Sequence, residues 1–384
     1  MRLHVNQRHE RVLEIVRKRG SLRVTELADE LGVSAVTVRR DVEALAEQGR
    51  LTRLHGSVSW PEPARAAVTP EESAGPRPAA VPAGVVLGMV VPSMEHYFAE
   101  LVRGAQNALA ARGGRLVLGI AHWRPEEDTA QIERMLDGGV DGLLLQPGWV
   151  RGVPTAEQER QLLALGVPAV LVDRRIPLGG RLAHLDSVRS DHVLGGAAAV
   201  HHLAGLGHTG IALLAQDNPT SPQVREGYEA AVAACGLTVR EPVTVDPQDP
   251  GSLDEAARRL HRAVRREGVT AALVHNDQTA IGVVQRLREL GLSVPDDVSL
   301  VAYEDEMAAL ADVPLTAVAP PRLAVGETAV DMMLARLAAR STASAGPAGP
   351  PVGGGAPSAA EVAPSRHVSL VPRLTVRASS ASPR

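Results

Sequence analysis

Residues 33–45 read VSAVTVRRDVEAL, and this stretch decides how the N-terminal part of the chain folds. The glycine before it can end one helix in the left-handed conformation. The Ser34 hydroxyl can then cap the next helix by accepting a hydrogen bond from a free backbone N–H. Three apolar residues, Val38, Val42 and Leu45, share one face at helical spacing. That face is therefore expected to pack inward.

The opposite face of this helix carries side chains suited to DNA. Two short helices joined by a tight glycine turn form a helix-turn-helix, whose second helix can enter the major groove. Arginine can contact phosphates or guanine edges there, and threonine can contact a phosphate or a thymine methyl. The residues expected at the DNA are Ser34, Val36, Thr37, Arg39 and Arg40. For two adjacent arginines alone, an ordinary solvated helix face is the alternative.

The surrounding sequence resembles the DeoR-type winged helix-turn-helix. The family motif V-S-x-x-T-hydrophobic-R-R-D matches residues 33–41, and a basic wing ending in His-Gly follows over residues 51–56. The resemblance covers about the first sixty residues. It implies a DNA-binding domain over residues 1–59, with further contacts to double-stranded DNA from Arg53 and His55 in the wing.

Charge and cysteine content fit a DNA-binding head on a larger body. Residues 1–60 hold 11 lysines and arginines against 8 acidic residues, whereas the rest of the chain holds 29 against 36. A basic end on an acidic body is typical of a small nucleic-acid-binding unit joined to a sensor. The single cysteine, Cys235, excludes an intrachain disulfide and suits a reducing cytosol. No apolar signal core or run of about 18 apolar residues is present, so we expect a cytoplasmic protein.

The rest of the sequence predicts an α/β fold after a linker. Residues 60–83 are rich in proline and alanine and predict a semi-extended linker. Residues 84–384 alternate apolar strand patterns with helical patterns, which is typical of doubly wound parallel sheets. The alternating strands and helices are too many for one ordinary sheet, so we expect two lobes with a boundary near residues 186–191. An Ala/Gly/Pro/Ser-rich insert over residues 341–365 is predicted to be disordered.

This two-lobed body resembles the effector domain of the LacI family, which is built like periplasmic sugar-binding proteins. The resemblance is spread over residues 85–377, and its most specific part joins Asn276-Asp277 to VPDDVSLV at residues 294–301. Residues 167–174 and 225–228 also match. The P-N-x-x-A-R hinge helix of the family is absent from the sequence. The resemblance therefore implies an effector cleft but not the family's minor-groove hinge mechanism.

Aromatic and polar residues gather where such a cleft is expected, because ligands of open parallel sheets bind outside the carboxyl ends of the strands. Five of the seven aromatics lie at or just past predicted strand ends: Tyr97, Phe98, Trp123, Trp149 and Tyr303. Polar groups that could bind sugar hydroxyls lie at matching loop positions: Asp173, Asp191, Arg225, Asn276, Asp277 and Glu304. Arg225 is expected to be the principal ligand contact, because the family match around it is close. Asn276 or Asp277 could equally cap the next helix.

The sequence carries neither a P-loop nor the Cys/His spacing of a metal site. We therefore predict no catalytic residue, metal or cofactor. The predicted function is a ligand-responsive transcriptional regulator, a repressor of carbohydrate-utilisation genes that binds a palindromic operator as a homodimer. A sugar-like effector between the lobes would change its operator affinity. The alternative is a cytoplasmic sugar-binding protein or sugar-modifying enzyme whose N-terminal unit mediates protein contacts.

Overall fold

The computed structural model describes two compact units, residues 1–77 and residues 78–384. In the first unit the described positions are 8–9, 11–13, 15–16, 21–31, 33–34, 37–38, 40–42, 45, 51–54 and 57–59. In the second unit they are residues 84–344 except 95, 150–151, 178 and 248, followed by residues 364–384. The predicted linker and most of the predicted insert lie outside these positions.

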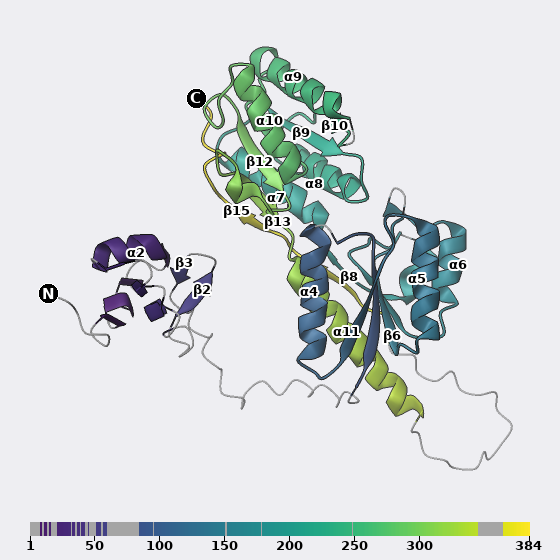
Figure 1. Ribbon diagram of the computed structural model, residues 1–384. Coiled ribbons are helices and arrows are strands. Elements are labelled where there is room, and N and C mark those ends of the chain that lie inside the picture. The colour runs from purple at the N-terminus through teal and green to yellow at the C-terminus, as the bar shows by residue number, and fades with distance from the viewer. Residues whose placement is uncertain are drawn as a thin grey trace, which may run out of the picture. The chain divides into compact units, whose positions relative to one another are not determined.

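The N-terminal unit is a small helical core with a three-stranded antiparallel sheet (Figure 1). Its labelled elements are β1 (Ser21–Arg23), α2 (Val24–Leu31), β2 (Thr52–Leu54) and β3 (Ser57–Ser59). The sheet order is β1-β3-β2, so the predicted wing hairpin is confirmed. Strand β1 is an addition that the sequence reading did not predict; it pairs with β3.

The first lobe of the body is built on a six-stranded sheet in which every neighbouring pair is parallel. Its strands, in sheet order, are β14 (His367–Leu370), β8 (Asp186–Ser190), β7 (Ala169–Val172), β6 (Gly142–Leu145), β4 (Val86–Val91) and β5 (Arg115–Ile120). Its helices are α4 (His96–Ala110), α5 (Pro125–Asp137), α6 (Ala156–Leu163) and α11 (Arg322–Ser344). Helices α4 and α11 share one apolar core with the sheet, and α5 and α6 share the other.

The second lobe repeats this plan. Its strands, in sheet order, are β10 (Val243–Val245), β9 (Ile211–Gln216), β11 (Ala271–Val274), β12 (Ser299–Tyr303), β13 (Thr316–Ala319) and β15 (Arg373–Thr375). Only the β13–β15 pair is antiparallel in this sheet. Its helices are α7 (His192–Gly205), α8 (Ser221–Ala234), α9 (Pro250–Arg266) and α10 (Asp277–Glu289). Helices α9 and α10 cover one face of the sheet and α7 and α8 the other.

The chain passes between the lobes three times. The first passage follows β8, the second joins β13 to α11, and the third joins β14 to β15. The predicted boundary near residues 186–191 marks the first passage, but the sequence reading missed that these residues form strand β8. Helix α11 therefore belongs to the first lobe although it comes late in the chain, and Figure 1 shows it beside α4.

Glycine makes the α4–α11 contact close. A Cβ atom on Gly104 would lie 2.1 Å from the carbonyl oxygen of Leu323, and one on Gly326 would lie 2.1 Å from that of Leu101. No other residue fits at such a distance, so the two helices can pack backbone to backbone. Helix α11 runs to Ser344, which corrects the predicted start of the disordered insert at residue 341. Among the described helices, none is both long and apolar enough to cross a bilayer.

Candidate effector-binding and DNA-binding sites

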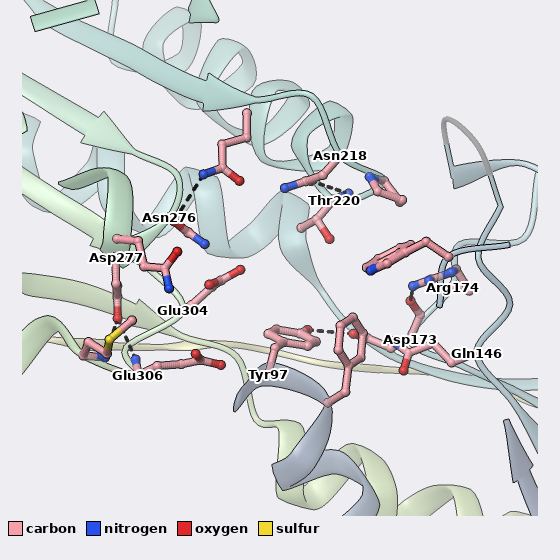
Figure 2. A pocket seen from close by; sticks show the side chains of 16 residues that line it. Tyr97, Gln146, Asp173, Arg174, Asn218, Thr220, Asn276, Asp277, Glu304 and Glu306 are labelled. Atoms are coloured by element: carbon pink, nitrogen blue, oxygen red, sulfur yellow. Dashed lines mark hydrogen bonds between the residues drawn. The ribbon is translucent and has the colours of Figure 1, made fainter. Parts of the chain in front are cut away.

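A cavity of about 440 Å³ lies between the two lobes, at the carboxyl ends of their parallel strands (Figure 2). The first lobe lines it with Tyr97, Phe98, Trp123, Gln146, Asp173 and Arg174. The second lobe lines it with Gln216, Asn218, Pro219, Thr220, Asn276, Asp277, Gln278, Glu304, Glu306 and Met307. Seven of the eleven predicted effector residues are thus brought together, as the rule for open parallel sheets anticipates.

An ionised carboxylate is anchored in the first-lobe wall. The Tyr97 hydroxyl donates to Asp173 Oδ2 at 2.6 Å, and the Ser190 backbone N–H donates to Oδ1 at 3.0 Å. Burial alone would raise the pKa of Asp173, but the His192 ring, the Tyr97 hydroxyl and the Ser190 N–H together lower that pKa below its usual range. Asp173 therefore holds a fixed negative charge, and burial raises the pKa of Tyr97 well above its usual value.

Three aromatic rings, two from the start of α4 and one from the loop after β5, form a continuous wall beside this carboxylate. Tyr97 and Phe98 meet edge to face with ring centroids 5.3 Å apart, and Phe98 and Trp123 do so at 5.6 Å. Trp123 is 42% exposed, which is unusual for so large an apolar side chain. An exposed ring in a polar cavity is suited to packing against the apolar face of a ligand.

Two polar residues of the first-lobe wall were missed by sequence reasoning. Arg174 is buried and donates from Nε to the Pro147 carbonyl at 2.7 Å and from Nη1 to the Asp173 carbonyl at 3.0 Å. Its Nη2, like both amide atoms of buried Gln146, has no hydrogen-bond partner among the described residues. Arg174 directly follows Asp173 in the family-like stretch, so its position in the sequence was the available signal.

In the second-lobe wall, the side chains of Asn276 and Asp277 accept hydrogen bonds from backbone N–H groups of the protein. The Asn276 Oδ1 accepts from the Thr279 N–H at 3.3 Å and so caps α10. The Asp277 carboxylate accepts from four backbone N–H groups of residues 305–308, at 2.6–3.3 Å. The capping alternative therefore holds for Asn276, whereas Asp277 shapes the loop after β12. Burial raises the pKa of Asp277, although these N–H groups oppose the rise.

Glu304 also lies in the second-lobe wall, and its carboxyl group has a strongly raised pKa. Its backbone has a φ of 105°, in the left-handed region that favours glycine. Burial first, and then the charges of Glu306 and Asp277, raise its pKa to about 8, against smaller opposing effects of Arg322 and Asn276. Figure 2 shows Glu304 on the side of the cavity opposite Asp173.

Arg322 joins the two lobes behind the cavity. It donates from Nη1 to the Glu304 carbonyl at 2.8 Å and to Glu306 Oε1 at 3.2 Å in the second lobe. Its Nε donates to Glu100 Oε2 at 3.1 Å on α4 of the first lobe, and its guanidinium lies 5.3 Å from the centre of the Tyr97 ring. The side chain is only 7% exposed. Arg322 thus contacts cavity-lining residues from both lobes at once.

Arg225, the expected principal ligand contact, lies outside the cavity. Buried residues of α8 recur at helical spacing and include Val224, Gly227 and Tyr228, so a residue one step along the helix points away from that face. The Arg225 side chain is 48% exposed and donates to Glu229 at 2.6 Å. The expectation of a ligand contact is contradicted by this geometry.

Three further predicted residues also lie outside the cavity. Trp149 is 1% exposed and packs in the core under α5 and α6. Tyr303 is fully buried, and its hydroxyl lies 3.0 Å from Nδ1 of His192. Asp191 caps α7 by accepting from the Leu194 N–H at 3.0 Å. Each residue lies near the end of a strand, as predicted, but its side chain packs or hydrogen-bonds within the protein and does not line the cavity.

On the N-terminal unit, the inward face of the predicted DNA helix is confirmed, since Val38, Val42 and Leu45 are at most 1% exposed. Ser34 accepts from the Thr37 N–H at 3.2 Å, as the capping prediction requires. Residues 37–38, 40–42 and 45 are helical, and Arg40 is exposed.

A buried ion cluster, missed from the sequence, holds this helix. Asp41 is 5% exposed and binds Arg8 and His9, with His9 Nε2 at 3.2 Å. Val36, Arg39 and His55 lie outside the described residues, as does the side chain of Arg53.

Comparison with known proteins identifies both units. Residues 8–64 match the model of the DeoR-like helix-turn-helix domain, and residues 200–380 match that of the periplasmic binding protein-like domain. The chain is 31% identical to the ribose operon repressor of Escherichia coli over 259 residues, which are 65% of this chain and 75% of that protein. The chain belongs to the LacI family of transcriptional regulators.

Two further similar proteins are also regulators of transcription. The arabinose metabolism transcriptional repressor of Geobacillus stearothermophilus is 27% identical over 82% of this chain and 84% of that protein. A LacI-family regulator from Mycobacterium smegmatis, of known structure, is 28% identical with a TM-score of 0.57 and covers 78% of this chain and all of that one. This LacI-family protein is thus a DNA-binding transcriptional regulator that carries a DeoR-like head.

Proposed function

We propose that this LacI-family protein represses carbohydrate-utilisation genes and that a sugar-like effector in the inter-lobe cavity changes its affinity for the operator. The single observation that carries the proposal is the cavity wall formed by Tyr97, Trp123 and Asp173. It combines an exposed ring, onto which a sugar face can pack, with an anchored carboxylate that can accept hydrogen bonds from hydroxyls.

The names of relatives support the sugar class. The two relatives described above are the ribose operon repressor and the arabinose metabolism repressor. A LacI-family regulator of Enterococcus faecium that shares the fold was solved with bound ribose. It is 22% identical to this chain with a TM-score of 0.59, and the match covers 78% of this chain and all of that one. We further propose that the protein acts in the cytoplasm as a homodimer on a palindromic operator, since one small head contacts too few base pairs for specificity.

Signal transfer follows from linkage, since an effector shifts an equilibrium only by binding two states with different affinity. The effector would contact both lobes, and the lobes are joined by three chain passages and by Arg322. Closing or opening of the cavity is therefore expected to move the two heads of a dimer relative to each other.

The test separates the two sites. An operator is first selected from random duplexes with the purified full-length chain, and binding is followed by fluorescence anisotropy. Sugar binding is followed by thermal shift with ribose, arabinose, cellobiose and glucosamine, because a ligand that binds the folded state raises its melting temperature.

Arg40→Ala should weaken operator binding by about tenfold or more and leave the sugar-induced shift intact. Trp123→Ala should abolish that shift and leave operator binding intact. Arg225→Ala is the matched control, because it removes an arginine that does not line the cavity, and both activities should persist. The proposal fails if the wild-type chain selects no duplex, or if Trp123→Ala responds to the same sugars as the wild type.

A further inference from the structure

Three of the four carboxylates that line the cavity already have partners in the protein. Asp173 is held by the Tyr97 hydroxyl and a backbone N–H, and Asp277 by four backbone N–H groups. Glu306 pairs with Arg322 at 3.2 Å. These three side chains therefore have their hydrogen-bond or ion-pair partners within the protein.

Glu304 differs from these three, because its side-chain partner is the neutral amide of Asn276. Its side chain is 17% exposed, and the nearest basic group recorded for its carboxylate is His275 Nε2, at 3.9 Å. The His275 ring is fully buried, and burial, with a contribution from His192, lowers its pKa to about 3, so it is neutral near pH 7. Arg322 donates to the Glu304 backbone carbonyl rather than to its carboxylate. Within the described part of the chain, no arginine or lysine pairs with this carboxylate.

The charge of the residues that line the cavity also favours a positively charged ligand group. Among the lining residues, four are acidic and only Arg174 is basic. A buried carboxylate without a cationic partner is costly, so it either keeps a proton or takes a cation. Figure 2 shows Glu304 reaching into the cavity between Asn276 and Tyr97, where a ligand group can meet it.

We propose that the effector is a polyhydroxylated molecule with a basic nitrogen, an amino sugar or iminosugar, whose ammonium group pairs with Glu304 in the second lobe. Its ring would pack on Trp123, and its oxygens would accept from Arg174 in the first lobe. This inference rests on the proposed function of the same cavity and narrows the sugar class.

The test uses sugars matched except for the amine. Glucosamine is compared with glucose, and galactosamine with galactose, by calorimetry on the full-length chain at pH 7. N-acetylglucosamine serves as a neutral control of similar bulk. Each amine is expected to bind at least tenfold more tightly than its neutral counterpart. Because free Glu304 is mostly protonated at pH 7, amine binding should also release close to one proton, measured in buffers of different ionisation heat.

The matched variant is Glu304→Gln, which keeps the shape and removes the charge. It should lose at least tenfold in affinity for the amines and lose the proton release, while neutral sugars change less than threefold. Glu241→Gln, which changes an 86% exposed carboxylate outside the cavity lining, should behave as the wild type. Circular dichroism checks that both variants fold.

The inference is overturned if neutral sugars bind as tightly as their amines, if the amine preference survives in Glu304→Gln, or if no amine of the panel binds. The proposed function is judged separately. If a neutral sugar binds and shifts operator affinity, only this inference fails. If no sugar of either kind changes the melting temperature or operator binding, both fail.

Discussion

The ion pairs of Arg322 give the sharpest test of how the two lobes are held together. Replacing Arg322 by alanine removes one partner of Glu306, which is 11% exposed, and one partner of Glu100, which is 40% exposed. It also removes a cation–π contact with Tyr97 at 5.3 Å.

The cost can be worked out from these contacts. Removing one partner of a buried ion pair costs about 3 kcal/mol or more, a half-exposed pair adds less than about 1 kcal/mol, and a partly buried cation–π contact adds about 1 kcal/mol. The expected loss is therefore about 4 kcal/mol. At about 2 °C per kcal/mol for a body of this size, the melting temperature should fall by about 8 °C.

The assay is thermal unfolding of the full-length chain, followed by near-UV circular dichroism in the absence of sugars. Arg103→Ala is the control, because Arg103 also binds Glu100, at 3.0 Å, but is 59% exposed. Its removal should cost less than about 1 kcal/mol. Equal melting temperatures for the two variants would contradict this prediction, since they would show that the inter-lobe contacts of Arg322 contribute no more than a surface pair.

Three further outcomes are expected. Gly227→Ala should lower the melting temperature by several degrees, because its Cβ would lie 1.9 Å from the Val193 carbonyl oxygen. Gly205→Ala is the control: its Cβ would have open space around it, so the melting temperature should stay the same or rise slightly. Equal melting temperatures for the two variants would contradict the close packing of α7 against α8. Folding raises the Glu304 pKa from 4.5 to about 8, so its contribution to stability is complete below pH 4.5 and is lost as the pH rises through 8. The wild-type melting temperature should therefore fall between pH 6.5 and 8.5, and that slope should flatten in Glu304→Gln; an unchanged slope would mean that another group titrates. Finally, Arg225→Ala should leave every measured sugar affinity within twofold of the wild type in calorimetry, and a tenfold loss would return this residue to the effector site.

The order and type of nearly all the described elements could be predicted from the amino-acid sequence. Continuous apolar runs marked the buried parallel strands, and helical spacing marked α2 and the inward face of the DNA helix, because these patterns depend only on local period and burial. The sequence also placed Tyr97, Trp123 and Asp173 at the cavity, since a residue just after a parallel strand must stand at the carboxyl edge of the sheet.

Which side chains at that edge enter the cavity could not be predicted from the sequence, because it depends on long-range packing. Tyr303, at the end of β12, and Arg225, on α8, were predicted to line the cavity together with Glu304 and Asn276. Their directions depend on neighbours far along the chain: His192 holds the Tyr303 hydroxyl, and the packing of α7 against α8 turns Arg225 outward. The inter-lobe role of Arg322 is non-local for the same reason, because its partners come from α4 and from the loop after β12. Local periodicity carries no information about such partners, since it records only which face of an element is apolar.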